Sequence, residues 1–152
     1  MSVELLAPAG DLSKLKIAIL YGANAVFIGG QKFSLRSRAS NFTLEDIKEG
    51  CDFAHKHNAK IHVTCNILPH EDDLEGLKEY LLELEQCGVD AIICASMVVI
   101  DYVLKYTKME CHVSTQESTL NQKMVDFFTD LGVDRVVLGR ELSIAQAKKI
   151  KE

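Results

Sequence analysis

Three basic residues, Lys32, Arg36 and Arg38, lie in a predicted loop over residues 29–41 that contains no acidic residue. The whole chain, in contrast, has 17 Lys and Arg against 22 Asp and Glu, a formal net charge of −5. The planar guanidinium of arginine can donate two parallel charge-assisted hydrogen bonds to a carboxylate or a phosphate. Because long loops in compact domains are often functional, this loop indicates a site for an anionic small molecule or a nucleic-acid backbone. A solvated surface loop is the alternative.

Further polar residues and glycines follow the predicted strands, where parallel α/β folds carry their reactive groups. A packed core alone does not require polar residues at these places. We therefore expect them to form one ligand-binding mouth, with support of neighbouring loops as the alternative role. They are Gly10, Gly29, Gly30, Asn66, Ser114, Gln116, Arg140 and Glu141.

No catalytic residue can be assigned from the sequence. Ser114 is a weak candidate for a nucleophile, because no G-x-S-x-G motif surrounds it and no histidine is tied to it by spacing. His112 is expected on the same face of its strand as Ser114, and His62 on a neighbouring strand. Glu4 and Glu141 are carboxylates without an assigned partner, although Glu141 follows an arginine and can form an ion pair with it.

The five cysteines are typical of reduced, buried thiols, because they are odd in number, widely spaced and free of any C-x-x-C motif. A metal site assembled by the fold is the alternative, although metal ligands usually show short spacings. The cysteines are Cys51, Cys65, Cys87, Cys94 and Cys111.

A joint that recurs four times along the chain predicts alternating helices and strands. In each copy a helical pattern ends at Gly22, Asn58, Gly88 or Gly132, and a short apolar run follows. Glycine and asparagine tolerate the left-handed conformation that ends a helix and turns the chain back toward a sheet. The predicted strands are 3–7, 25–29, 60–65, 90–94, 109–114 and 134–138. The predicted helices are 11–21, 43–57, 73–87, 97–106, 119–131 and 143–152.

Several of these helices begin at a recognisable N-cap residue. Asp72 and Glu75 suggest a capping box at the start of helix 73–87, in which leucines then mark one face. Other predicted N-caps are Asp11, Thr43 and Ser143.

Six short apolar strands alternating with six helices predict a parallel sheet covered by helices. The turn after the first strand, residues 7–11, has neither G-x-G-x-x-G nor a P-loop lysine, which favours a barrel over a nucleotide-binding sheet. A complete (β/α)₈ barrel takes about 250 residues. We therefore expect an α/β fold, an incomplete TIM-barrel-like domain of about six βα units, with residues 1–152 as the N-terminal part of one truncated domain.

The composition is that of a folded protein, with 47% hydrophobic and 26% charged residues. No apolar run approaches the roughly 20 residues that span a bilayer, so we expect no membrane insertion. The N-terminus has no basic region or cleavage site of a signal peptide, which favours a cytoplasmic location.

Six segments of the chain closely resemble the collagenase-like, unassigned-type peptidase family U32, in particular its tRNA-hydroxylation branch. The resemblance extends over nearly the whole chain. The segments are ELLAPAGD (4–11), YGANAV (21–26), FSLRSRASNF (33–42), TCN (64–66), STQ (114–116) and RELS (140–143). The chain departs from the family pattern at residues 95–97 and at Gly139, where many relatives have alanine.

The resemblance implies a TIM-barrel-like N-terminal domain, a peptidase label and, in the tRNA branch, prephenate-dependent 5-hydroxylation of a wobble uridine. Other branches act on rRNA or support ubiquinone hydroxylation. The cysteines that hold an iron–sulfur cluster in this family lie downstream of the RELS segment, so a cluster is expected only from that region. Residues that match the family's strand-end motifs are Gly10, Gly29, Gly30, Arg36, Arg38, Asn41, Asn66, Ser114, Gln116, Arg140 and Glu141.

Three hypotheses about function follow. In the first, the chain is part of an RNA-hydroxylation enzyme that acts on tRNA or rRNA, and its mouth binds an anion such as prephenate, which has two carboxylates. The second is a collagenase-like peptidase, for which the sequence shows no nucleophile, metal site or carboxylate pair with adequate spacing. The third is an inactive fragment that needs its C-terminal part or another copy, because an unclosed sheet leaves edges open to self-association.

Overall fold

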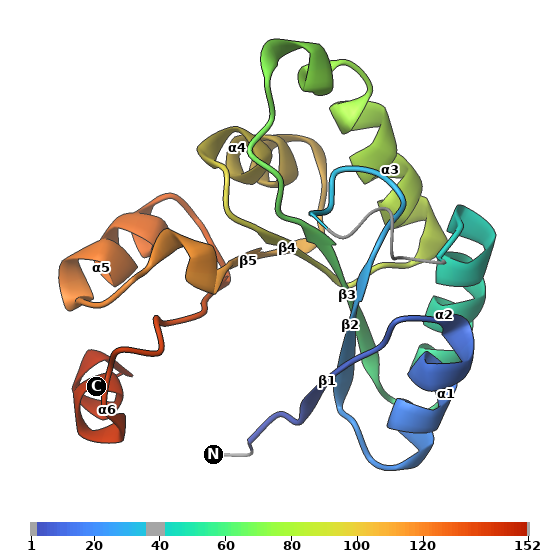
Figure 1. Cartoon of the computed structure of the whole chain (residues 1–152), viewed down its shortest axis with the longest axis horizontal. Coiled ribbons are helices and arrows are strands. Elements are labelled where there is room, and N and C mark those ends of the chain that lie inside the picture. Colours follow the sequence, from blue (N-terminus) through green and yellow to red (C-terminus); the bar gives the residue numbers. More distant parts are fainter. Residues whose placement is uncertain (1–2, 36–41, 152) are drawn as a thin grey trace.

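The structure, a computed structural model, describes residues 3–35 and 42–151. Six parallel strands curl into a half-barrel, and helices follow the strands along the chain (Figure 1). The strands are β1 (Leu6–Pro8), β2 (Ala25–Gly29), β3 (Lys60–Cys65), β4 (Ala91–Cys94), β5 (Glu110–Val113) and β6 (Arg135–Val136). The α-helices are α1 (Leu12–Leu20), α2 (Leu44–Lys56), α3 (Leu77–Cys87), α4 (Met97–Tyr106), α5 (Gln122–Asp130) and α6 (Ile144–Lys151). Two 3₁₀ helices are η1 (Glu71–Leu74) and η2 (Thr115–Glu117).

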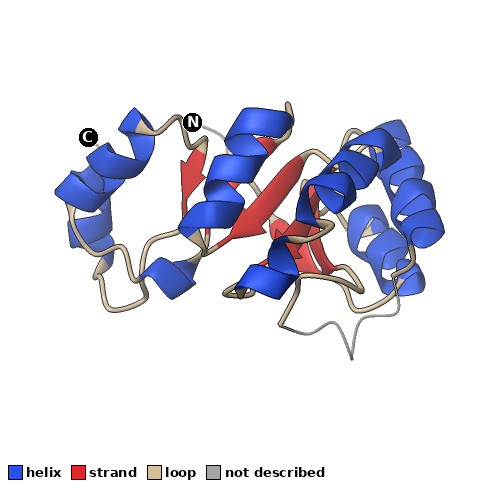
Figure 2. Cartoon of the chain, turned by 90° about the horizontal axis from the view of Figure 1, so that it is seen from above, coloured by secondary structure: helices blue, strands red, loops and turns tan. Residues whose placement is uncertain are grey.

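The order of the strands in the sheet is the same as their order in the chain. Each neighbouring pair is parallel; for example, Val63 of β3 is in register with Ile92 of β4, and Ile92 with Cys111 of β5. A doubly wound sheet would instead reverse its strand order at a switch point. The predicted TIM-barrel-like architecture is therefore confirmed, and Figure 2 shows the helices around the outside of the strands.

The core lies between the outer face of the sheet and the helices. Ile61 and Val63 on β3 are fully buried, as are Leu81 and Leu84 on α3. Successive side chains of a strand point to opposite faces, so the residues that alternate with Ile61 and Val63 along β3 point into the barrel. None of the described helices combines the length and apolar composition that crossing a bilayer requires.

All four predicted joints are confirmed. Gly22, Gly88 and Gly132 have φ of 101°, 93° and 94°, and Asn58 has φ of 56°. An L-residue with a Cβ rarely adopts this left-handed region, which glycine enters freely and asparagine tolerates. The conformation ends the helix and returns the chain to the next strand, so it sets the spacing of the βα units.

The helix starts agree with the sequence at three N-caps: Asp11, Thr43 and Ser143 each accept a hydrogen bond from a backbone N–H of the first turn. The capping box expected at Asp72 and Glu75 is wrong. Residues 71–74 form η1, in which the carboxylate of Asp73 accepts the backbone N–H of His70 at 2.8 Å. Gly76, with φ of 82°, then resets the backbone direction, and α3 begins at Leu77.

Another difference lies after β5, where the predicted helix 119–131 begins later, at Gln122. The 3₁₀ helix η2 comes first, and Ser118, the C-cap residue that follows it, has φ of 47°. Asn121 is the N-cap, because its side chain accepts the N–H of Met124 at 3.0 Å.

Candidate functional site

A cavity of about 630 Å³ opens at the carboxyl ends of the strands. Residues from β1, β2, β3 and β4 line this cavity, together with residues from the segments that follow β1, β2, β3, β5 and β6. They are Leu6, Pro8, Ala9, Gly10, Phe27, Gly29, Ser34, Leu35, Thr64, Asn66, Ile93, Ser114, Thr115, Gln116 and Val137. Parallel α/β barrels carry their ligand sites at this end. We refer to this space below as the mouth cavity.

The structure brings together five of the residues selected from the sequence, namely Gly10, Gly29, Asn66, Ser114 and Gln116, which all line the mouth cavity. Another three, Gly30, Arg140 and Glu141, lie outside it. The remaining three, Arg36, Arg38 and Asn41, fall outside the described residues. Ser34, Thr64 and Thr115 are further polar lining residues, and each lies within a segment that carried the resemblance.

Gly30 has a steric role in the structure. A Cβ at this position would lie 1.9 Å from the hydroxyl oxygen of Tyr80, a side chain of α3 that is almost fully buried. Atoms cannot approach so closely, so only glycine allows Tyr80 to pack against the end of β2.

Arg140 and Glu141 are exposed in the turn between β6 and α6. The ion pair expected between them is not formed in the part of the chain that the structure describes. The carboxylate of Glu141 lies over Gly139 instead, 2.7 Å from the position that a Cβ of residue 139 would take. Leu120 Cδ2 would lie 2.5 Å from the same Cβ, so any larger residue at position 139 would require the ends of these two side chains to move.

Neutral polar groups form a hydrogen-bonded network on one wall of the mouth cavity. The backbone N–H of Leu35 donates to Asn66 Oδ1 at 3.2 Å, and Asn66 Nδ2 donates to Gln116 Oε1 at 3.0 Å. Gln116 Nε2 donates back to the carbonyl oxygen of Asn66 at 3.4 Å. The hydroxyl of Ser114 donates to Gln116 Oε1 at 3.3 Å. The network holds the end of β3 and the segment after β5 together across β4.

None of the described residues that line the mouth cavity is charged. Burying a carboxylate without a cation carries a large desolvation penalty. The described wall therefore suits an uncharged ligand group. Lys32 of the basic loop does not line the mouth cavity, so the anion site predicted from that loop depends on Arg36 and Arg38.

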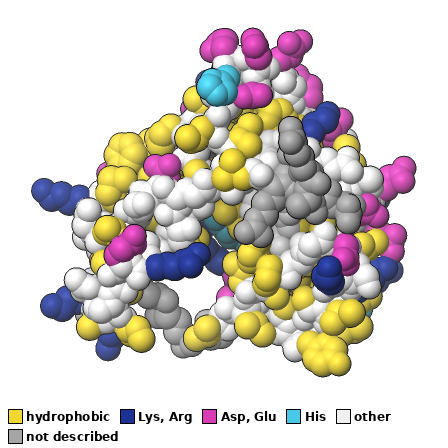
Figure 3. Space-filling model, in the orientation of Figure 1, with side chains coloured by type: hydrophobic (Ala, Val, Ile, Leu, Met, Phe, Trp, Pro, Cys, Tyr) yellow, Lys and Arg dark blue, Asp and Glu magenta, His cyan; other side chains and the backbone are white. Residues whose placement is uncertain are grey.

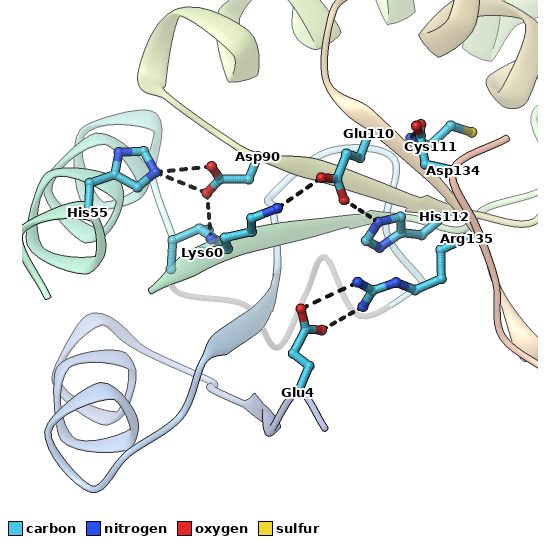
Figure 4. A network of polar contacts seen from close by, with 10 residues as sticks. Glu4, His55, Lys60, Asp90, Glu110, Cys111, His112, Asp134 and Arg135 are labelled. Carbon is cyan, nitrogen blue, oxygen red and sulfur yellow. Dashed lines mark hydrogen bonds and ion pairs between the residues drawn. The ribbon is translucent and has the colours of Figure 1, made fainter. Parts of the chain in front are cut away.

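A charged cluster lies at the opposite, amino-terminal end of the barrel interior (Figure 4). Glu110 on β5 accepts hydrogen bonds from Lys60 on β3 at 2.9 Å and from the ring of His112 at 2.9 Å. The Lys60 contact is the main reason that the pKa of Glu110 falls to about 2, with a smaller effect from His112. Arg135 on β6 forms two hydrogen bonds with the carboxylate of Glu4. The sequence analysis did not predict this cluster, although polar residues alternate with apolar ones in β3 and β5 and could have indicated it.

His62 lies among these groups, and both of its ring nitrogens are buried without a hydrogen-bond partner in the described structure. Burial lowers its pKa to about 4. Its ring meets that of His112 edge-on, with centroids 4.8 Å apart. The prediction that the two histidines lie on neighbouring strands is wrong, because β4 lies between β3 and β5. They meet inside the barrel, where alternate strands contribute side chains to one layer.

No nucleophile and base are brought together among the described residues. Ser114 bonds with Gln116, while His112 bonds with Glu110. All five thiols are free; Cys51, Cys65, Cys94 and Cys111 are buried as predicted, whereas Cys87 is partly exposed. Within residues 3–35 and 42–151, no three His, Cys, Asp or Glu side chains are placed to hold a metal ion.

The sequence of residues 10–152 matches the family model described as peptidase family U32. The chain belongs to peptidase family U32. The tRNA hydroxylation protein P1 of Bacillus subtilis (strain 168), a relative, is 51% identical over 98% of the chain. A 23S rRNA 5-hydroxycytidine synthase of Escherichia coli (strain K12) is 41% identical over 99% of the chain. The U32 resemblance, including its tRNA-hydroxylation branch, is therefore confirmed.

The chain spans 36% of the Bacillus subtilis relative and 22% of the Escherichia coli relative. Among solved structures, the U32 peptidase Mk0906 superposes with a TM-score of 0.72 at 11% identity, over 90% of this chain and 58% of that chain. At that identity the superposition supports the barrel fold alone. The matched U32 relatives thus share nearly all of this chain but extend well beyond it.

Proposed function

We propose that this chain forms the barrel part of a protein that hydroxylates carbon 5 of a pyrimidine in RNA, with the tRNA wobble uridine as the target. The observation that carries the proposal is the 51% identity with tRNA hydroxylation protein P1, which extends over the strand ends and loops that build the mouth cavity. The 23S rRNA 5-hydroxycytidine synthase supports the same class of chemistry at a pyrimidine. A location in the cytoplasm is part of the proposal.

An anionic small molecule, prephenate, is the proposed second ligand. Its two carboxylates suit the guanidinium groups of Arg36 and Arg38, because each can form a forked, charge-assisted contact. Ser34 and Leu35 belong to the same loop, directly before Arg36 in the sequence, and both line the mouth cavity. The anion would therefore bind at the rim, beside the uncharged wall.

The iron–sulfur cluster that the family implies does not fit the residues of this chain. A cluster needs about four ligands, mostly cysteine thiolates, and among the described residues no three His, Cys, Asp or Glu side chains are grouped to hold a metal. Cys94 and Cys111 lie 3.7 Å apart in the core behind the sheet, away from the mouth cavity.

Contact with RNA would use a surface from which Lys and Arg side chains project. Figure 3 shows acidic side chains gathered at the top, over η1 and the start of α3, and Lys and Arg side chains projecting on the left, where α5 and α6 lie. RNA phosphates bind to basic surfaces and are repelled by acidic ones. We therefore expect the RNA to approach from the α5–α6 side.

Self-association through the sheet edges is also proposed. In the described residues β1 pairs only with β2, and β6 only with β5, so each has a free edge. Edge strands with unpaired backbone groups readily pair with another strand. Light scattering on the purified chain would give the mass; a monomer at micromolar concentration would contradict this proposal.

Mass spectrometry of tRNA nucleosides tests the proposed function. Deletion of the full-length gene should abolish 5-hydroxyuridine, and the restored gene should return it. Unchanged 5-hydroxyuridine in the deletion strain would overturn the proposal. Cleavage of gelatin by the repeatedly purified full-length protein, without any effect on tRNA, would favour the peptidase hypothesis instead.

A further inference from the structure

We propose that the side-chain amides of Asn66 and Gln116 recognise the carbonyl oxygens of a uracil base in the mouth cavity, and so act as specificity-determining residues. The inference rests on the proposed function. It adds the place where the base binds and the reason that uracil is preferred to cytosine.

A single backbone group fixes the orientation of both amides. The N–H of Leu35 can only donate, so the Asn66 atom that faces it must be the oxygen Oδ1. Asn66 Nδ2 then faces Gln116, which must present its oxygen Oε1. Gln116 Nε2 is left to donate to the backbone oxygen of Asn66. Neither amide can turn over without breaking a bond in this series.

The bonds within the network leave donors rather than acceptors on Gln116. Its Oε1 already accepts from Asn66 Nδ2 and Ser114 Oγ, which fills both lone pairs. Each amide nitrogen carries two hydrogens and uses one of them within the described structure. The pair therefore retains two N–H donors, and Asn66 Oδ1 retains one lone pair. Uracil presents two carbonyl oxygens with an N–H between them, whereas cytosine presents an amino group in place of one carbonyl.

The rest of the mouth cavity suits a flat, uncharged ring. Phe27, Ile93 and Val137 are partly exposed apolar side chains on its lining, and the described lining has no charge. Bases in RNA are recognised by aromatic and apolar contacts with their faces and by hydrogen bonds along their edges. An enzyme that modifies a base must draw it out of its stack into such a pocket. A dicarboxylate would instead lose its hydration without gaining a cation.

Binding of a tRNA anticodon stem–loop to the full-length protein tests this inference, with uridine or cytidine at the wobble position. We expect the wild-type protein to prefer uridine by about tenfold, since a correctly paired set of hydrogen bonds discriminates bases by that order. Gln116→Glu keeps the size of the side chain but replaces a donor with a carboxylate oxygen. It should reduce the preference to less than about twofold. Gln86→Glu, an exposed change on α3, is the matched control and should leave the preference intact.

Asn66→Asp is a second variant that removes the other donor, and circular dichroism verifies that each variant is folded. The inference is overturned if both folded variants retain the wild-type preference, or if the wild-type protein shows none. It is also overturned if Gln116→Glu abolishes prephenate binding while the base preference stays unchanged, because the cavity would then hold the anion. Loss of 5-hydroxyuridine on gene deletion tests the proposed function separately, so either can fail alone.

Discussion

The guanidinium of Arg135 holds the carboxylate of Glu4 with two hydrogen bonds, Nη1 to Oε1 at 2.5 Å and Nη2 to Oε2 at 3.3 Å (Figure 4). The two residues are 131 positions apart in the sequence. Arg135 begins β6 and Glu4 precedes β1, so the contact joins the two edges of the curled sheet across the barrel interior. It also lowers the pKa of Glu4, mainly through the hydrogen bonds from Arg135.

This contact should stabilise the fold more than an ordinary surface ion pair does. We expect a double-mutant cycle with Arg135→Met and Glu4→Gln to give a coupling of about 1 kcal/mol, because the forked geometry is partly shielded from water. Urea unfolding of the four proteins measures it. The exposed i,i+4 pair Lys48–Asp52 is the control, with an expected coupling of about 0.3–0.5 kcal/mol. A coupling at Arg135–Glu4 no larger than the control would contradict the prediction.

His62 should make the fold less stable in mild acid. Burial lowers its folded-state pKa from 6.5 to about 4, and the nearby charges of His112 and Arg135 act in the same direction, against Glu4 and Glu110. Above pH 6.5 the folded and unfolded states both hold a neutral ring, so its contribution is fully present there. As the pH falls toward 4 the unfolded chain binds a proton that the folded chain does not. The free energy of unfolding should therefore fall by about 2 kcal/mol between pH 7 and pH 5 through this group.

Urea unfolding at several pH values measures this effect in wild type and in His62→Leu, which removes both unpartnered ring nitrogens. The variant should lose less stability between pH 7 and pH 5 than wild type does. His70→Gln, a change of an exposed histidine in the segment before η1, should keep the wild-type dependence. Equal slopes in His62→Leu and wild type would show that His62 does not set the response to pH.

Gly30→Ala should destabilise the protein through a steric clash rather than through loss of a ligand contact. The new Cβ would lie 1.9 Å from the Tyr80 hydroxyl oxygen, and overpacking of a buried site costs about 1–3 kcal/mol. Thermal unfolding measures the loss, and adding Tyr80→Phe should recover part of it. Gly10→Ala is the control, because its Cβ would meet only the flexible end of Lys14 at 4.0 Å. A Gly30→Ala protein as stable as wild type would contradict the packing shown here.

The local features of the fold could be predicted because their causes lie within a few residues of chain. Gly22 and Asn58 end helices because each can adopt a positive φ. Thr43 caps α2 by accepting a hydrogen bond from the backbone N–H of Asp46, three residues further along the chain. The wrong prediction at Asp72 also concerns neighbouring residues. Asp72 and Asp73 are adjacent acidic residues that could each take part in a capping motif, and in the structure it is Asp73 that accepts the backbone N–H of His70.

Contacts across the barrel could not be predicted, because they depend on how far the sheet curls. The sequence gives no partner for Glu4, because its partner Arg135 lies on β6, 131 positions away in the chain. His62 and His112 meet although β4 separates their strands. The mouth cavity was anticipated at Asn66, Ser114 and Gln116, since strand ends gather at one edge in any parallel barrel. The absence of charged side chains from its described lining was not anticipated, because the sequence does not show which charged residues point away from the cavity.

Arg36→Ala and Arg38→Ala should each weaken the binding of prephenate by about 1–3 kcal/mol, if each guanidinium makes a charge-assisted contact with a carboxylate. Both arginines lie outside the described residues, in the loop that follows β2. The described wall of the mouth cavity offers no cation, so the anion has no other strong partner there. Calorimetry with the full-length protein at low and high salt measures the effect, and the wild-type affinity should fall with salt because such contacts are screened. Lys56→Ala, a change of an exposed cation at the end of α2 that does not line the mouth cavity, should bind prephenate like wild type. Undiminished affinity in both loop variants would contradict the proposal that these two arginines bind the anion.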